Sequence, residues 1–194
     1  MKSNFRIRKP TKWPTKEGGL WGRVLKPIQE GMGEDATRAR EILTRSQAVV
    51  ELLSVLDSEV HNGGIHHYFW NSSGDHAEKL LESLCLIGAK PYVTLFKKAC
   101  TVFPSAIVPT DCKRRRELLA DISEERMGKI FDDAFFSLRT APGKKLESFV
   151  EAFIRANPEE FFLRDDEPEP VDSDVDPRLW KSDYRVSRSS VALL

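Results

Sequence analysis

The residues best suited to chemistry lie close together, because all four histidines, His61, His66, His67 and His76, occur within residues 61–76. An imidazole can act as a general acid or base near neutral pH, and it is a common metal ligand. The spacing does not suit a metal site, since His66 and His67 are adjacent and point about 100° apart on a helix. The segment also lacks an H-E-x-x-H pattern. We therefore expect no metal and no cofactor.

Proton transfer by one of these imidazoles together with Asp75 is a second interpretation of the same segment. The sequence offers no nucleophile motif and no phosphate-binding loop to accompany it. We therefore predict a protein that is not an enzyme and has no catalytic residue. An uncharacterised hydrolase that uses the histidine-rich segment remains an alternative.

Composition places the chain of 194 residues, 40% hydrophobic and 31% charged, in the soluble globular class. No window reaches the roughly 18 to 20 uncharged apolar residues that span a bilayer, and the first residues lack the apolar stretch of a secretory signal. Three cysteines, Cys85, Cys100 and Cys112, form no C-x-x-C pair and indicate reduced thiols. We expect a cytoplasmic protein that does not bind membranes.

The net charge of zero conceals two ends of opposite sign. Residues 1–26 contain eight basic residues and one acid, whereas residues 159–176 contain nine acids and one base. Clustered charge of this kind governs partners and association rates. We hypothesise that the acidic end contacts either the basic end or the cluster Lys113–Arg116. The acidic candidates for binding a partner are Asp165, Asp166, Glu167, Glu169, Asp172, Asp174 and Asp176.

Apolar residues recur with helical spacing through most of the middle of the chain. Ile42, Val49, Leu53, Leu56 and Val60 line one face of a helix that is expected over about residues 34–60. Further helices are expected at about 75–88, 91–103, 111–120, 124–138 and 145–156, and strand signals are nearly absent. The predicted fold class is all-α. A compact multi-helix domain at 34–163 follows an irregular basic arm at 1–33 and precedes a disordered acidic tail at 164–194.

Between the first two helices lies a glycine-rich and polar segment that has its own physical interpretation. Glycines permit a sharp turn, side-chain amides bond nearby backbone groups, and Ser73 or Asp75 is suited to cap the next helix. We favour a turn-and-cap device and keep a direct binding role as the alternative. The residues concerned are Asn62, Gly63, Gly64, Asn71, Ser72, Gly74 and Asp75.

The string from His61 to Asp75 resembles the signature of the C-terminal domain of the bacterial DNA-mimic protein family of neisserial type, approximately N-G-G-F-x-x-F-F-x-N-S-S-G-D. The similarity continues through Ile87-Gly88-Ala89 and covers roughly residues 34–162. It implies an all-helical domain without known catalytic chemistry and with a tendency to form homodimers. In the founding member, an acidic surface occupies the DNA-binding site of a transcription factor.

The resemblance and the charges together favour a non-enzymatic protein-binding module, a DNA-mimic-like regulator that binds a DNA-binding protein. The alternative is a nucleic-acid-binding protein that uses the basic arm, where Phe5, Trp13 and Trp21 alternate with cations. We favour docking of Trp13, Leu20 and Trp21 onto the helical core, and therefore no direct contact with nucleic acid. For Lys113–Arg116 we favour a solvated helix face with local ion pairs.

Overall fold

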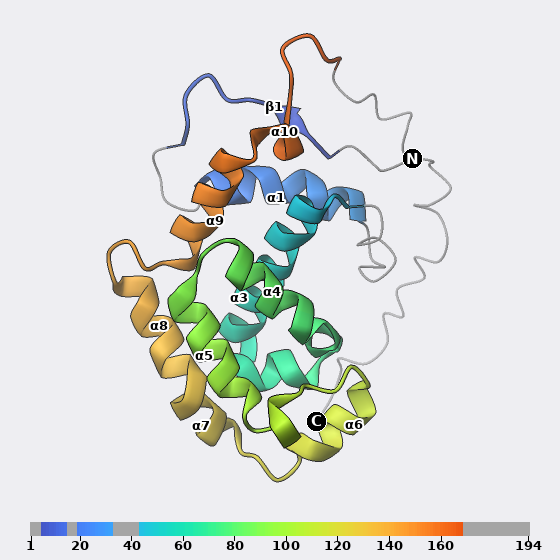
Figure 1. Ribbon diagram of the computed structural model, residues 1–194, viewed down its shortest axis with the longest axis vertical. Coiled ribbons are helices and arrows are strands. Elements are labelled where there is room, and N and C mark those ends of the chain that lie inside the picture. Colours follow the sequence, from blue (N-terminus) through green and yellow to red (C-terminus); the bar gives the residue numbers. More distant parts are fainter. Residues whose placement is uncertain (1–4, 15–18, 33–42, 169–194) are drawn as a thin grey trace, which may run out of the picture.

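The computed structural model describes residues 5–14, 19–32 and 43–168, and these form a bundle of helices (Figure 1). The all-α prediction is confirmed. No helix within the described ranges has the length and apolar character needed to cross a bilayer. The helices are α1 (Gly19–Met32), α3 (Arg45–Trp70), α4 (Ala77–Leu86), α5 (Lys90–Cys100), α6 (Cys112–Leu119), α7 (Glu124–Met127), α8 (Asp133–Thr140), α9 (Leu146–Ala156) and α10 (Pro158–Phe161). Short turns of 3₁₀ helix occupy Ser72–His76 and Pro104–Ala106, and a π-helical turn occupies Gly128–Asp132.

Helix α3 is the axis of the bundle, and other helices pack around it (Figure 1). Its first turn is closed by a capping box, in which the backbone N–H of Gln47 donates to Thr44 Oγ1 at 3.3 Å and the backbone N–H of Thr44 donates to Gln47 Oε1 at 3.2 Å. This T-R-S-Q pattern starts the helix at Arg45, whereas the spacing of apolar residues predicts a start near residue 34. Residues 33–42 lie outside the described part of the chain.

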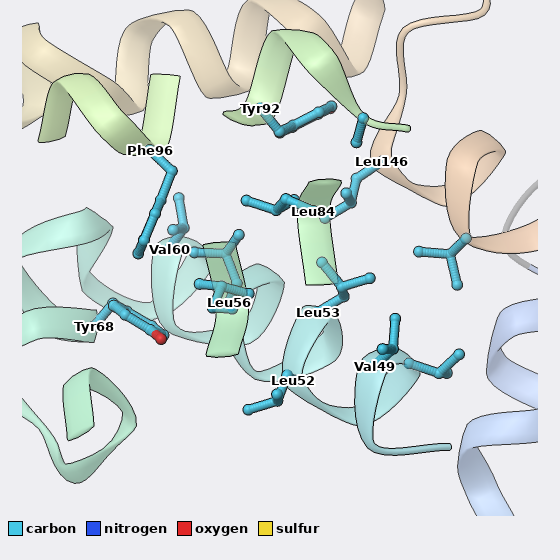
Figure 2. Packing of buried hydrophobic residues seen from close by; sticks show 14 of the residues in the cluster. Val49, Leu52, Leu53, Leu56, Val60, Tyr68, Leu84, Tyr92, Phe96 and Leu146 are labelled. Carbon is cyan, nitrogen blue, oxygen red and sulfur yellow. The ribbon is translucent and has the colours of Figure 1, made fainter. Parts of the chain in front are cut away.

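The core combines the apolar stripe of α3 with aromatic rings from several helices. Figure 2 shows Leu53, Leu56 and Val60 of α3 among Leu84, Tyr92 and Leu146. The rings of Phe69 and Phe103 meet edge to face at 5.1 Å between centroids, an arrangement that adds to the stability from burial alone. The aromatic run 68–70 therefore serves the core through its first two residues, while Trp70 remains 38% exposed.

The prediction of an irregular arm over residues 1–33 is wrong for residues 19–32, which form α1. Leu20, Trp21, Val24 and Ile28 are buried there, at spacings that place them along one face. Three glycines and Pro27 weaken the helix, so burial against α3 and α9 must stabilise it. The backbone N–H of Leu20 also donates to a carboxylate oxygen of Glu151 in α9 at 2.9 Å.

The expected docking of Trp13, Leu20 and Trp21 is confirmed. Leu20 is fully buried, Trp21 is 6% exposed, and the Trp13 ring packs edge to face on Phe162 at 5.5 Å. The guanidinium of Arg155 lies over the same Trp13 ring at 4.6 Å. The aromatic residues of the basic arm thus contact the protein's own core.

Two short parallel strands join the ends of the described chain. Strand β1 (Ile7–Arg8) pairs with β2 (Phe162–Leu163), with Ile7 opposite Phe162. The sequence did not predict this pairing, because two-residue strands carry no periodic pattern. The pairing places the basic arm beside the start of the acidic run, residues 159–176.

Candidate functional site

A buried arginine organises the segment that the sequence analysis singled out. Arg115 of α6 has no exposed surface, although the run of four cations predicts a solvated face for the whole Lys113–Arg116 cluster. That prediction is wrong for Arg115 and holds for Arg114, whose exposed side chain forms a local ion pair with Glu117 at 3.2 Å. A buried guanidinium requires acceptors for its five N–H groups.

The acceptors of Arg115 come mainly from the polar signature segment. Its Nε donates to the carbonyl of Phe69 at 2.5 Å, and its Nη2 donates to the carbonyl of Asn71 at 2.7 Å and to Asp75 Oδ1 at 2.5 Å. Its Nη1 donates to the carbonyl of Pro109 at 2.7 Å. Arg115 therefore ties the end of α3, the following turn and the loop before α6 into one unit.

This arrangement gives Gly74 and Asp75 roles that differ from those expected. A Cβ atom on Gly74 would collide with Arg115 Nε, so the glycine supplies room for the guanidinium. Asp75 does not cap α4, whose N-cap residue is His76 without a side-chain hydrogen bond. The expected capping by Ser73 is also absent, because its hydroxyl donates to Glu59 Oε1 instead.

The remaining polar residues of the signature lie on either side of this unit. Asn71 Nδ2 donates to Glu59 Oε2 at 3.0 Å, and His67 Nδ1 lies 2.6 Å from the same Oε2. Asn62 and Ser72 are exposed. The carboxylate of Glu59 thus contacts three polar side chains of the turn, those of Asn71, Ser73 and His67. This role was not predictable from the sequence, because Glu59 lies inside the helical pattern of α3.

The double glycine breaks α3 as the turn interpretation predicts. Gly64 has φ +73°, a conformation that favours glycine, whereas Gly63 is extended at φ −168°. Beyond the break the helix restarts, and the backbone N–H of Ile65 donates to Asp132 Oδ1 at 2.8 Å. Asp132, from the π-helical turn, caps this second half of α3 in the manner of an N-cap residue.

Burial raises the pKa of Asp132, and the neighbouring Asp133 adds to this effect, while the hydrogen bond from Ile65 and the charge of His66 oppose it. Because the folded-state pKa lies above its ordinary value, ionisation of Asp132 costs stability near neutral pH. That cost disappears as the pH falls through the raised pKa toward the unfolded value.

We therefore expect Asp132→Asn to keep or slightly raise the free energy of unfolding at pH 7, since the amide oxygen still caps Ile65 without the charge. Asp132→Ala should lower it by about 1–2 kcal/mol through loss of the cap. Urea unfolding at pH 7 measures both. Equal destabilisation by the two changes would show that the carboxylate charge itself is stabilising.

Ionic contacts elsewhere join α3 to α8 and α9. Arg139 donates to Asp57 Oδ1 at 2.6 Å and lies 3.0 Å from Glu147 Oε1. Burial raises the pKa of Asp57, against the opposing charges of Arg139 and His61. Burial also raises the pKa of the nearby Tyr92 to about 12, so its phenol stays neutral at physiological pH. Residues this far apart in sequence gave no signal of this network.

The four histidines take separate positions. His61 Nδ1 lies 2.6 Å from the carbonyl oxygen of Asp57, and His66 stacks on Trp70 at 5.7 Å. His67 contacts Glu59, and His76 is the N-cap residue of α4. In the part of the chain that the structure describes, no three His, Cys, Asp or Glu side chains are grouped closely enough to hold a metal ion.

The acidic candidates divide into three sets. Glu167 contacts the basic arm, because Arg6 donates to its carboxylate through two nitrogens at 2.7 and 3.1 Å. The hydrogen bond from the backbone N–H of Arg164 and the bonds from Arg6 lower the pKa of Glu167. The Arg6–Glu167 contact fits the hypothesis that the charged ends meet. Asp165 and Asp166 are exposed. Glu169, Asp172, Asp174 and Asp176 lie outside the described residues.

One family model, described as DMP19-like protein, matches residues 41–157. This range is more than half of the 194 residues, and it contains the glycine break, the polar turn and Arg115. The basic arm, α1 and the acidic run lie outside it. No curated protein and no solved structure matches the chain.

Proposed function

Because the chain belongs to the DMP19-like protein family, a family of DNA mimics, we propose that it is a non-enzymatic regulator that binds a DNA-binding protein. In this proposal the acidic run, defined as residues 159–176, occupies the cationic surface that the partner otherwise offers to DNA. Phosphate contacts dominate the affinity of DNA-binding proteins, so a dense set of carboxylates competes for the same cations.

The observation that carries the proposal is where the acidic run leaves the fold. Strand β2 and the Arg6–Glu167 ion pair hold its first part against the basic arm, and Asp165 and Asp166 are exposed there. Between residues 51 and 150, in contrast, acids and bases are nearly balanced at 14 and 13. The C-terminal stretch is therefore the densest negative segment that the chain offers to a partner.

The contacts of the signature favour a structural role for its polar groups over a catalytic one. Asp75 and the carbonyls around it accept from Arg115, and His67 meets Glu59. These groups hold the turn in place, which favours a structural turn over a hydrolytic site.

The contacts of the basic arm support a protein partner over a nucleic acid. Arg6 is engaged by Glu167 and Trp13 by Arg155 and Phe162. A nucleic acid would have to displace these contacts to use the same groups.

The proposal predicts that neutralising the acidic run weakens capture of the partner by at least about tenfold. Six exposed ion pairs contribute about 2 kcal/mol together at about 0.3 kcal/mol each. The acid-run variant neutralises Asp165, Asp166, Glu169, Asp172, Asp174 and Asp176 with Asn or Gln and keeps Glu167. The full chain and the variant are each immobilised and incubated with native lysate. The measurement is the amount of DNA-binding protein that each one retains and that duplex DNA then elutes.

A matched acid-control variant neutralises six exposed acids elsewhere: Glu78, Glu117, Asp121, Glu124, Glu125 and Asp133. It should retain the partner as the unmodified chain does. Capture that survives in the acid-run variant, or that duplex DNA fails to reverse, would refute the proposal.

A further inference from the structure

An apolar groove lies between the first turns of α3 and the outer face of α4, close to α5. It consists of two adjoining hollows of about 560 and 180 Å³ that share Arg45, Glu82 and Leu86. Leu86 is 45% exposed and Leu81 is half-buried beside it. We call this surface the α3–α4 groove.

Cations surround the groove. Arg45, Lys79 and Lys97 line it and are exposed, and none of them forms an ion pair with another described residue. Glu82 is the acid among the lining residues. An apolar floor with a mainly positive rim suits a segment that combines apolar side chains with acids.

The chain itself contains such a segment beyond the described residues. Residues 169–176 carry four acids, and Leu179, Trp180, Tyr184 and Val186 follow within ten residues. No other stretch outside the described ranges combines an acid run with two aromatic residues.

The C-terminal stretch leaves the described fold close enough to the α3–α4 groove for this segment to reach it. Gln47 Nε2 donates to the carbonyl of Glu160 at 3.0 Å, so the C-terminal stretch passes the first turn of α3, where Arg45 begins the groove. The eleven residue-to-residue steps from Pro168 to Leu179 span up to about 36 Å when extended.

We propose that the segment Leu179–Val186 docks in the α3–α4 groove, with its apolar side chains on Leu81 and Leu86 and the preceding acids near the cationic rim. This inference goes beyond the proposed function and stands without it. Docking would hold the acidic run between two anchors, the Arg6–Glu167 pair and the groove.

Cys85 provides a native reporter, because it lines the groove and is exposed. The other two cysteines must not react in this assay. The half-buried Cys112 is therefore replaced by serine. Cys100 is unreactive because burial raises the pKa of its thiol to about 12. The rate of Cys85 alkylation by uncharged N-ethylmaleimide is measured in the full chain and in a chain that ends at Pro168.

We expect alkylation about tenfold slower in the full chain. A tethered segment at an effective concentration of about 1 mM, with an intrinsic Kd of about 0.1 mM, is docked roughly nine-tenths of the time. Leu179→Ala/Trp180→Ala should restore the fast rate, whereas the matched control Leu193→Ala/Leu194→Ala should stay slow. A synthetic peptide of residues 169–188 should protect the shortened chain, and a scrambled peptide should not.

Equal rates in the full and shortened chains would overturn the proposal, including the case in which residues 33–42 cover the groove in both. Protection that rises with protein concentration would overturn it in favour of a second copy as occupant. None of these outcomes depends on capture of a DNA-binding partner, so the docking and the proposed function fail or survive separately.

Discussion

Replacement of Arg115 by methionine is expected to lower the free energy of unfolding by about 3–5 kcal/mol, because several acceptors lose their donor at once. The change leaves Asp75 and the carbonyls of Phe69, Asn71 and Pro109 without their donor. Each buried acceptor that loses its partner costs about 1–3 kcal/mol. Methionine fills similar volume, so the loss reports the hydrogen bonds more than a cavity.

Urea unfolding followed by circular dichroism measures the effect. Arg115→Lys should rescue little, because an ammonium cannot reproduce the planar fork that reaches acceptors on several segments. Arg114→Met is the matched control, since Arg114 pairs only with the exposed Glu117 among the described contacts, and it should change stability by less than about 0.5 kcal/mol. Similar effects at positions 114 and 115 would contradict the role assigned to Arg115.

Gly64→Val is expected to destabilise the protein by about 2–4 kcal/mol. A β-branched residue at φ +73° is strained by about 1–3 kcal/mol. Its Cβ would also collide with Asp132 Oδ2 and displace the carboxylate that caps Ile65. Thermal and urea unfolding of the variant measure the combined cost.

Gly63→Val and His66→Ala are the comparison variants. At Gly63 the backbone is extended, so the change adds no positive-φ strain, although the added Cβ meets the Cβ and Cγ atoms of His67 at 2.8 Å. His66→Ala removes the stacking on Trp70 and the electrostatic interaction with Asp132. We expect both to cost less than Gly64→Val, and a Gly64 variant no less stable than His66→Ala would disprove the turn interpretation.

The helices were predictable where one apolar stripe repeats, and the double glycine was predictable because few residues end a helix so sharply. Arg115 was missed because it stands in a run of four cations, which favours a solvated face. Its position offered a signal, since Arg115 and the buried Leu119 are four residues apart and share a helix face. The need for a glycine at position 74 depends on Arg115, which lies 41 positions later in the sequence, so the local sequence could not reveal it.

Helix α1 and the strand pair were not predictable for a related reason. Glycines and a proline lower the helix propensity of residues 19–32, and the acceptor for the N–H of Leu20 is supplied by Glu151, 131 positions away. The opposite charges of the two ends did predict their attraction, and Arg6–Glu167 realises it in one pair. Long-range partners of this kind leave no local pattern.

The central claim, that the acidic run competes with DNA for a protein partner, is tested most directly by displacement. The captured DNA-binding protein is bound to a fluorescently labelled duplex, the full chain is titrated in, and fluorescence anisotropy is followed. The account predicts a fall to the value of the free duplex, with at least about tenfold more acid-run variant needed for the same effect. Anisotropy that stays constant or rises, or equal displacement by the acid-run variant, would contradict it.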